Sequence, residues 1–496
     1  MKKTVFIKNA AILTSTGTIL RLAGIFFKVW LASSIGGEGI GLYQLIFSVY
    51  SLFSALFVSG TPIAVTRLCA TEFITGSKEG LCRILRRAIT VALFIAFITF
   101  TLLLFGSDFI AERILSDKRA ALSISILAFS LPFMAVSSVI KGYFAARRKA
   151  GENSLAVLIE QAVRIIFCIF LVKKFAIYGI GGAVAGVLAG DTISEAVSCI
   201  YICIAYKYDS KKLEFKNNVE AFKGISEFIR ITVPITASRY STSLLRTAEN
   251  ILMPKSLAKS GGDYSSALSV FGAVKGMALP LLFFPSSILN AFSSLLIPEM
   301  SDALALKKPY IIKNSTEKVL TTTWLIGVIF GCYFFLCGEK LGLFIYSSAD
   351  AGYLIKVLAP LVPLMYADSI SDGILKGLDR QKHSFITATA DSVLRIILIY
   401  IFVPIYSVTG FIIIMYISNL FTFILNVGKL LLITGVKPKL FSDIIFPVLS
   451  AFALCTLFDG AFTFIKNDIL YFALMLIFSG GGYFAIYFKK LINLYR

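Results

Sequence analysis

The sequence has 496 residues, of which 57% are apolar and 15% charged; its mean hydropathy is +0.84 and its net charge +20. About 25% charged residues would be usual for a soluble protein, so these values exclude a soluble globular protein and a disordered chain. The apolar residues form unbroken runs without alternation, which excludes a transmembrane β-barrel. The fold class is therefore an all-α polytopic membrane protein.

Charged and polar residues divide the chain into fourteen apolar runs, and a spanning helix needs about 20 apolar residues. In chain order the predicted transmembrane helices are 9–34, 42–71, 88–106, 120–145, 154–173, 179–205, 226–250, 266–299, 317–337, 353–375, 384–403, 410–430, 440–459 and 468–488. The second is interrupted by Gly60 and Pro62 and the eighth by Pro280 and Pro285, so kinks are expected in both. The first follows Met-Lys-Lys but is too long for a signal peptide, so we interpret it as a retained span.

The excess of positive charge predicts the orientation. If the N-terminus is placed inside, Lys and Arg residues are roughly three times as frequent in the inner segments as in the outer ones, as the positive-inside rule expects. The sequence therefore predicts a multi-pass plasma-membrane protein with both termini cytoplasmic. No basic stripe with interleaved aromatic residues lies outside the apolar runs, so nucleic acid is not expected as a partner.

An internal repeat divides the chain. Residues 127–179 match residues 358–410 at a constant offset of 231, without a gap. The matched pairs include Leu127/Leu358, Pro132/Pro363, Met134/Met365, Ser138/Ser369, Gly142/Gly373, Glu160/Asp391, Arg164/Arg395 and Gly179/Gly410. The paired spans run in the same direction, which is typical of transporters built from two similar halves. We predict a six-helix lobe at 1–206, a basic cytoplasmic linker at 207–225, a second pseudo-symmetric six-helix lobe at 226–433 and two extra helices at 434–496.

Metal and haem sites are not expected from the sequence. The eight cysteines include no C-x-x-C, and His383 is the only histidine. Most of the cysteines lie inside apolar runs, where a thiol behaves as a small apolar group.

Two acid–base pairs repeat within the predicted spans. Glu160 and Arg164 are four residues apart, as are Asp391 and Arg395. Spacing of i,i+4 with the acid first suits an ion pair along one helix. A charge inside a span costs at least about 2.5–3.5 kcal/mol, so it pairs, reaches the interface or lines a wet cavity. Both a structural pair and a functional one remain open interpretations.

A second set of intramembrane charges consists of basic residues. It consists of Arg21 and Lys28 on span 1, Arg67 on span 2, Arg239 and Arg246 on span 7, and Lys275 on span 8. Both pairs on spans 1 and 7 are seven residues apart, so each pair shares a helix face. Glu249 is within reach of Arg246, and Arg67 is close enough to the cytoplasmic end to snorkel. A cavity lined by such residues suits an anion, because guanidinium binds phosphate in a bidentate manner.

Several stretches resemble a known family. They are Gly17-x-x-x-Arg21-x-x-Gly24, the segment Leu31–Gln44 with Gly36-x-Glu38-Gly39-x-Gly41, the run Gly60-Thr61-Pro62-Ile63-Ala64-Val65, and Gly373–Gln381. This pattern resembles the polysaccharide-exporter branch of the multidrug/oligosaccharidyl-lipid/polysaccharide superfamily, to which the lipid II flippases are similar, and it extends over nearly the whole chain. The resemblance implies fourteen spans, two lobes with an alternating-access cleft, and a lipid-linked saccharide substrate.

The resemblance also suggests roles for individual residues. Cavity arginines on the early helices are required in the lipid II flippases, and Arg21 and Arg67 match them by helix and motif. A cation drives the cycle in some relatives, so Glu249 and Asp391 are our candidates for binding a monovalent cation or a proton. No other cofactor is expected. Span 8 departs from the pattern, because it carries Lys275 and no arginine.

The leading hypothesis is a flippase, not an enzyme, for an anionic saccharide on undecaprenyl pyrophosphate, such as a peptidoglycan precursor for cell wall or spore cortex. Its partners would be that lipid, membrane lipids and cell-wall synthases. The first alternative is a cation-coupled multidrug antiporter of the same superfamily, which needs an acidic cavity. A membrane enzyme is disfavoured, because the longest loop is Lys-rich and Asp368/Asp372 followed by Lys376 looks like an ion-pair ladder or cation site. A non-transporting scaffold in a cell-wall or spore-coat assembly also stays open.

Overall fold

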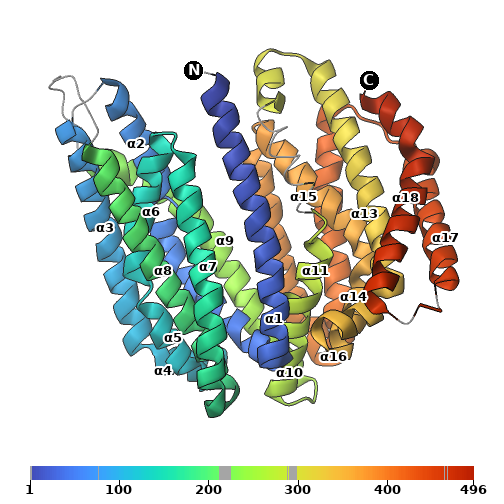
Figure 1. Ribbon diagram of the computed structural model, residues 1–496, viewed down its shortest axis with the longest axis horizontal. Helices are drawn as coiled ribbons and strands as arrows, with labels where there is room; N and C mark the ends of the chain where they lie inside the picture. The colour runs from blue at the N-terminus through green and yellow to red at the C-terminus, as the bar shows by residue number, and fades with distance from the viewer. Residues whose placement is uncertain are drawn as a thin grey trace. The chain divides into compact units, whose positions relative to one another are not determined.

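The computed structural model describes residues 3–75, 78–211, 225–286, 289, 299–462, 464–465 and 467–495. The regular elements among these residues are all helical (Figure 1). The chain forms two compact units, Met1–Ile251 (unit 1) and Leu252–Arg496 (unit 2). The predicted linker at 207–225 lies largely outside the described residues, and the predicted division into two lobes stays a prediction.

Unit 1 is an antiparallel helical bundle that begins with a long bent helix. Its elements are α1 (Lys3–Val58), α2 (Thr61–Thr75), α3 (Lys78–Phe105), α4 (Ser107–Phe109), η1 (Ile110–Leu115), α5 (Ala120–Ala128), α6 (Leu131–Ala146), α7 (Ala150–Phe175), η2 (Ala176–Tyr178), α8 (Gly179–Lys211) and the first part of α9 (Ile225–Lys259). Gly36 breaks α1 with φ 69°, a value that glycine adopts without steric cost. The interruption expected at Gly60 and Pro62 is confirmed, because the helix stops at Val58 and restarts at Thr61.

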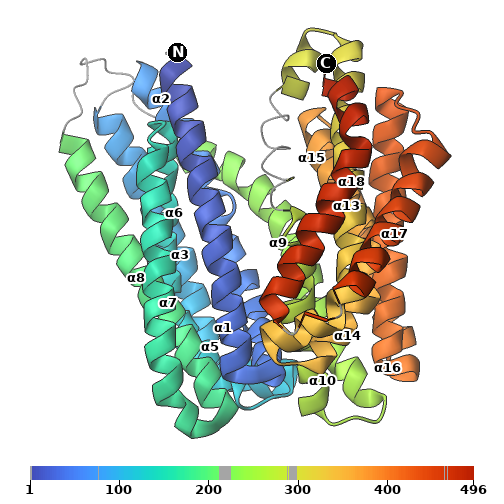
Figure 2. The ribbon, with the colours of Figure 1, turned by 45° about the vertical axis from the view of Figure 1, so that its right-hand side comes forward.

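Unit 2 contains the rest of α9 and the C-terminal helices. Its elements are α10 (Tyr264–Gly272), η3 (Ala273–Ala278), α11 (Leu279–Phe283), α13 (Pro309–Tyr346), α14 (Ala349–Leu358), η4 (Ala359–Leu361), α15 (Val362–Gly377), α16 (Gln381–Thr434), η5 (Leu440–Ile445), α17 (Phe446–Ala461) and α18 (Asp468–Tyr495). The last two helices pack beside α13 (Figure 2), where Val328 meets Cys455 and Tyr483 in one buried cluster. Burial of this apolar surface fixes the two extra helices to unit 2.

The helices are long and apolar enough to cross a membrane. Within the described part of the chain, nine helical stretches meet that standard, or ten if α5 and α6 together form one bent span. Three of these stretches contain 60, 62 and 54 residues. At 1.5 Å per residue each is at least about 80 Å long, which is enough for two crossings of a hydrocarbon core of about 30 Å. The total of fourteen spans stays a prediction.

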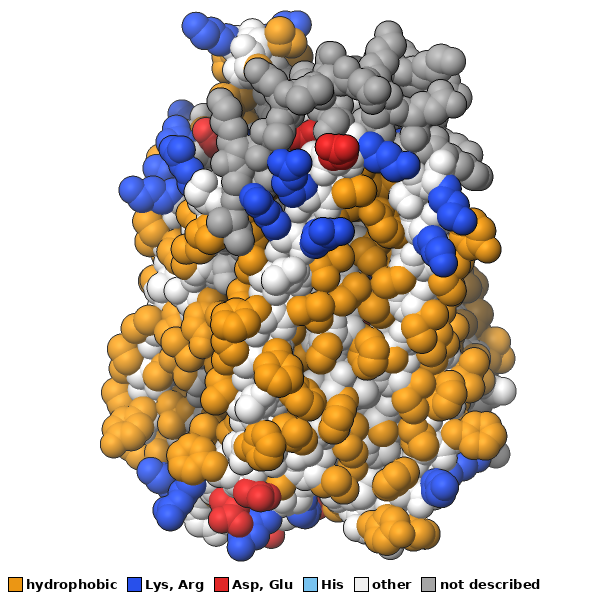
Figure 3. Space-filling view, turned by 90° about the vertical axis from the view of Figure 1, so that its left-hand side faces the viewer, with side chains coloured by type: hydrophobic (Ala, Val, Ile, Leu, Met, Phe, Trp, Pro, Cys, Tyr) orange, Lys and Arg blue, Asp and Glu red, His pale blue; other side chains and the backbone are white. Residues whose placement is uncertain are grey.

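The surface of unit 1 has the layered polarity of a membrane protein. One face shows a broad apolar band between two rims that carry Lys and Arg side chains (Figure 3). Large apolar side chains such as Phe94, Phe105 and Phe170 are 66%, 81% and 75% exposed. Water would not tolerate a contiguous apolar surface of this size, so lipid covers it.

The internal repeat has a structural counterpart in each unit. Helix α6 begins at Leu131 and α15 at Val362, and the ends of these two helices, Ala146 and Gly377, are also 231 residues apart. The apolar run predicts one span at 120–145, but the chain bends by 42° between α5 and α6. Pro132 explains the bend, because it has no N–H to bond the preceding turn.

A buried carboxylate ties two helix ends together in unit 1. Asp209, near the end of α8, is 6% exposed and accepts hydrogen bonds from Tyr143 Oη at 2.7 Å, Arg147 Nε at 3.0 Å and Lys149. Burial alone would raise the pKa of this carboxyl, but the bonds from Arg147, Lys149 and Tyr143 outweigh burial and lower the pKa to about 2. Asp209 therefore stabilises the folded unit wherever it is ionised.

Replacing Asp209 with Asn is expected to lower the apparent melting temperature at pH 7 by about 2–8 °C, because it removes charge-assisted bonds worth roughly 1–2 kcal/mol in a unit of this size. The unfolded pKa is near 3.9, so the stabilisation is present above that value and is lost as the pH falls toward about 2. Thermal unfolding of detergent-purified protein from pH 7 to pH 3 measures both effects. Asp108→Asn, an exposed carboxylate in α4, is the control. A constant difference between wild type and Asp209→Asn down to pH 3 would contradict the role of the charge.

Candidate functional site

Two of the predicted cationic residues lie on the first half of α1. Arg21 and Lys28 are both exposed within unit 1. Glycines at positions 17 and 24 have no atoms within 4 Å of where a Cβ would stand, so the helix surface around Arg21 is open. Arg21 lies near the middle of the predicted span 9–34, too far from either interface for easy snorkelling.

Helix α9 contributes two further arginines, and its position in unit 1 is set by close contacts with the end of α1. A Cβ on Gly60 would stand 2.5 Å from both Thr232 O and Thr236 Oγ1. Further along α9, Thr247 Oγ1 donates to Ser48 O at 3.0 Å. The glycine of the Gly60-Thr61-Pro62 motif therefore allows the backbones to approach closely.

The two arginines of α9 follow the same side of the helix as these contacts. Arg239 is seven residues after Thr232 and Arg246 is seven residues after Arg239, so all three share one face. Both arginines are exposed within unit 1. Arg67 on α2 is exposed as well. Residues up to Ile251 of α9 thus pack with unit 1, although the sequence grouped this helix with the second half of the chain.

The last member of the cationic set lies elsewhere. Lys275 is half-buried in η3, a π-helical segment of unit 2. All the other members belong to unit 1, where α1, α2 and α9 carry them on exposed surfaces. Their role in binding a substrate stays a prediction.

Replacing Gly60 with Ala is expected to displace α9 from α1, because the new methyl group would stand 2.5 Å from the Thr232 carbonyl oxygen. The expected cost is about 1–3 kcal/mol, since the backbone of α9 must move. A lower apparent melting temperature in detergent measures it. Gly151→Ala in α7 is the matched control, because a methyl group there meets nothing within 4 Å. Equal melting temperatures for the two variants would contradict the close approach.

The candidates for the coupling ion differ in their surroundings. Glu249 on α9 is only 6% exposed. Asp391 on α16 is held by Arg395, whose Nε lies 3.0 Å from Asp391 Oδ2, and accepts a hydrogen bond from Ser418 Oγ. The intrahelical pairs predicted for Asp391/Arg395 and Glu160/Arg164 are both confirmed. Asp391 is therefore already neutralised by a guanidinium.

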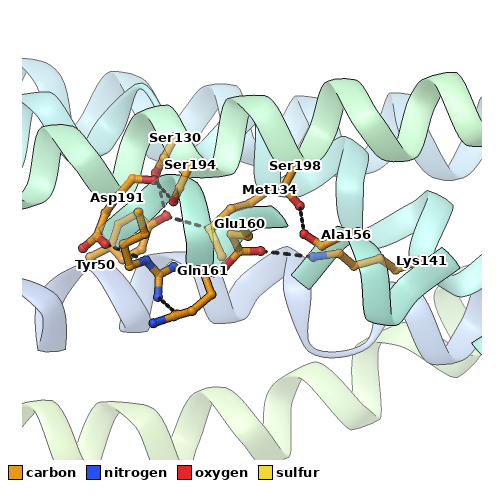
Figure 4. Close-up of polar contacts among 11 residues, drawn as sticks. Tyr50, Ser130, Met134, Lys141, Ala156, Glu160, Gln161, Asp191, Ser194 and Ser198 are labelled. Atoms are coloured by element: carbon orange, nitrogen blue, oxygen red, sulfur yellow. Dashed lines mark hydrogen bonds and ion pairs between the residues drawn. The ribbon is translucent and has the colours of Figure 1, made fainter. Parts of the chain in front are cut away.

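A partly buried polar cluster in unit 1 includes Lys141, Glu160 and Asp191 (Figure 4). Arg164 Nη2 lies 2.9 Å from Glu160 Oε1 on the same helix, and its Nε lies 2.8 Å from Asp191 Oδ1 on α8. Lys141 Nζ on α6 reaches Glu160 Oε2 at 3.6 Å. Glu195, one turn beyond Asp191, interacts electrostatically with the same cations. Three carboxylates thus face two cations.

The repeated positions in unit 2 carry different chemistry. At the offset of 231, Asp191 corresponds to Thr422 and Glu195 to Asn426. Asn426 Nδ2 donates to Asp368 Oδ1 at 2.8 Å, so the amide partners a carboxylate there. Lys376 pairs with Asp372, which confirms the ion pair predicted in that segment. The two acids that α8 supplies near Arg164 therefore have no acidic counterparts at the repeated positions of unit 2.

The acids of α8 were not among the residues predicted from the sequence. Asp191 and Glu195 lie inside the predicted span 179–205, four residues apart, and Asp191 is only 5% exposed. A signal was available, because two acids on one face of a span are costly unless a cation on another helix faces them.

The long apolar helices are those of a multi-pass membrane protein. A family model described as "Polysaccharide biosynthesis protein" matches residues 6–304, and the MatE model matches residues 261–401. Stage V sporulation protein B of Bacillus subtilis (strain 168) is 29% identical over 383 residues, which are 76% of this chain and 74% of that protein.

Solved structures show the same fold. The lipid II flippase MurJ in an inward closed conformation aligns with a TM-score of 0.75 at 17% identity, over 97% of this chain and all of that one. An inward-facing multidrug resistance MATE family transporter aligns with a TM-score of 0.64 at 15% identity, over 86% of this chain and all of that one. The chain belongs to the polysaccharide biosynthesis protein family, within the multidrug/oligosaccharidyl-lipid/polysaccharide transporter superfamily.

Proposed function

We propose that this transporter is a flippase that moves a saccharide linked to undecaprenyl pyrophosphate across the plasma membrane. The observation that supports it most is the exposure of Arg21 and Arg239 near the middle of their predicted spans. A guanidinium exposed to hydrocarbon costs at least about 2.5–3.5 kcal/mol, so these side chains face a wet surface. A wet cationic surface at bilayer depth suits a negatively charged cargo.

The proposed chemistry is recognition of a pyrophosphate. Arginine presents two parallel N–H donors to a phosphate, so Arg21 and Arg239 would each hold it in a bidentate manner. Lys28, Arg67 and Arg246 of unit 1 are proposed to add positive potential around it, and Lys275 stays a candidate from the sequence. The saccharide would occupy the polar side of the site and the polyprenyl chain would remain among the lipid. Alternating access would then expose the head group on the outer side.

Coupling to a monovalent cation or a proton is part of the proposal. Glu249 is a buried acid on the same helix as Arg239 and Arg246, so ionisation or cation binding there would act on the cargo-binding helix. Asp391 is the second proposed site, and Arg395 would have to release it before it could take a cation.

The second candidate is a cation-coupled multidrug antiporter, which the MatE match over residues 261–401 favours. An antiporter for cationic drugs needs acids facing its cavity. The exposed residues singled out on α1, α2 and α9 are basic, and the nearby acid Glu249 is buried. The sign of the charge therefore supports the anionic cargo.

Native mass spectrometry of the purified protein tests the two candidates. A flippase of this kind is expected to retain a polyprenyl pyrophosphate, with or without its saccharide, in a fraction of the molecules. The adduct should disappear in the Arg21→Ala/Arg239→Ala variant and persist in Arg83→Ala/Arg86→Ala, in which two exposed arginines of α3 are removed. Absence of any polyprenyl adduct, together with drug hypersensitivity of a deletion strain, would favour the antiporter.

A further inference from the structure

Unit 2 contains an apolar recess unconnected with the cationic residues discussed above. Its volume is about 350 Å³, and α13, α15, α16 and η5 line it. Phe423 and Val427 of α16 face Leu320 and Trp324 of α13 across it, and the rings of Trp324 and Phe423 are 6.3 Å apart. Apolar walls of this kind exclude water and match a hydrocarbon chain.

The indole of Trp324 lines the recess, but its N–H is buried away from the open space. Trp324 Nε1 is buried and makes no hydrogen bond within the part of the chain that the structure describes. A buried N–H without an acceptor is costly, and a tryptophan normally finds one. Because this N–H is buried away from the open space, an occupant of the recess contacts the indole ring of Trp324 and not its Nε1.

Two acidic residues line the mouth of the recess, although lysine is frequent in the neighbouring segments of unit 2. Asp443 lines the mouth but is already bonded by Lys490 Nζ at 2.7 Å. Glu317 also lines it, is exposed, and pairs with no cation among the described residues. The Glu317 carboxylate is therefore available to pair with a positively charged group of an occupant.

Glu317 and Trp324 are correctly spaced for one amphiphile. They are seven residues apart, so they share a face of α13 and are separated by about 10 Å along its axis. Residue 317 begins the predicted span 317–337, which places the carboxylate at head-group level and the indole deeper. A phosphoethanolamine-glycerol head group extends over this length, from its ammonium to its ester carbonyl.

We propose that this recess binds an aminophospholipid of the phosphatidylethanolamine type. Glu317 receives the ammonium, and one acyl chain lies against Trp324, Phe423 and Val427. An anionic phospholipid offers the same chain but places no cation at Glu317.

The test uses Trp324 as the reporter. The chain has two tryptophans, and Trp30→Phe leaves Trp324 alone in the full-length protein. This variant is reconstituted in phosphatidylcholine vesicles containing a small fraction of phosphatidylethanolamine or phosphatidylglycerol with dibrominated acyl chains, which quench nearby indoles. Brominated phosphatidylethanolamine is expected to quench with at least threefold higher apparent affinity than phosphatidylglycerol.

Variants separate the head group from the chain. Glu317→Gln should remove the preference and leave chain quenching, whereas Asp302→Asn, an exposed acid outside the recess, should keep the preference. Equal quenching by both head groups in the parent, stronger quenching by phosphatidylglycerol, or quenching no greater than brominated phosphatidylcholine gives would each overturn the proposal. Displacement by undecaprenyl phosphate as effective as by unlabelled phosphatidylethanolamine would also overturn it. Native mass spectrometry of Glu317→Gln confirms that a folded variant, and not an unfolded one, has lost the lipid.

Discussion

Replacing Arg21 and Arg239 together with alanine is expected to abolish head-group translocation in reconstituted vesicles while the protein still folds and inserts. Each guanidinium–phosphate contact is a charge-assisted hydrogen bond worth about 1.5–3 kcal/mol, so losing two should reduce the rate by roughly 10²–10⁴. Both side chains are exposed within unit 1, so their removal does not leave a cavity in its core. A fluorescent polyprenyl-pyrophosphate saccharide, quenched only after it reaches the outer leaflet, measures the rate.

Lysine substitutions separate charge from geometry. Arg21→Lys/Arg239→Lys keeps both charges but loses the planar pair of donors, so it should retain more translocation than the alanine pair and less than the wild type. Arg83→Ala/Arg86→Ala on α3 should translocate at the wild-type rate and controls for the loss of two positive charges. An undiminished rate in Arg21→Ala/Arg239→Ala would remove the basis for an anionic cargo.

Local features of the fold followed from the sequence. Apolar runs located the helices, because each must bury its backbone in hydrocarbon, and the i,i+4 rule identified Glu160/Arg164 and Asp391/Arg395 as pairs. The bend before α6 could not be predicted from the apolar run 120–145, because hydropathy does not show that a backbone N–H is missing. Pro132 was the residue that indicated it.

Contacts between distant segments could not be predicted in this way. The packing of α9 on Gly60 joins residues more than 170 positions apart, and a helix pattern carries no information about its partner. The Arg164–Asp191 contact is similar, because α7 and α8 each show an unremarkable apolar run. The exposure of Arg21 and Arg239 emerged only once the neighbours of each helix were known, and their role in binding stays a prediction.

The repeated arginines have acquired different surroundings. Arg164 holds Glu160 and Asp191 across two helices, while Arg395 holds Asp391 and donates from Nε to Ser418 Oγ at 2.6 Å. Arg164 contacts acids of two helices and screens their mutual repulsion, whereas Asp191 and Glu195 have no acidic counterparts at the repeated positions of unit 2. Replacing Arg164 and replacing Arg395 remove the same side chain, so a difference between their effects on stability measures the contribution of the neighbouring acids.

Arg164→Ala is accordingly expected to cost about 3–5 kcal/mol, because it leaves Glu160, Asp191 and Glu195 with Lys141 as their remaining cation. That corresponds to a fall of about 6–20 °C in the apparent melting temperature of a unit this large. Arg395→Ala is the matched control and should cost less, because Asp391 keeps the hydrogen bond from Ser418. The double variant Arg164→Ala/Asp191→Asn should recover part of the loss, since it removes one of the repelling charges. Equal losses for Arg164→Ala and Arg395→Ala, without recovery in the double variant, would show that the extra acids of α8 do not depend on Arg164.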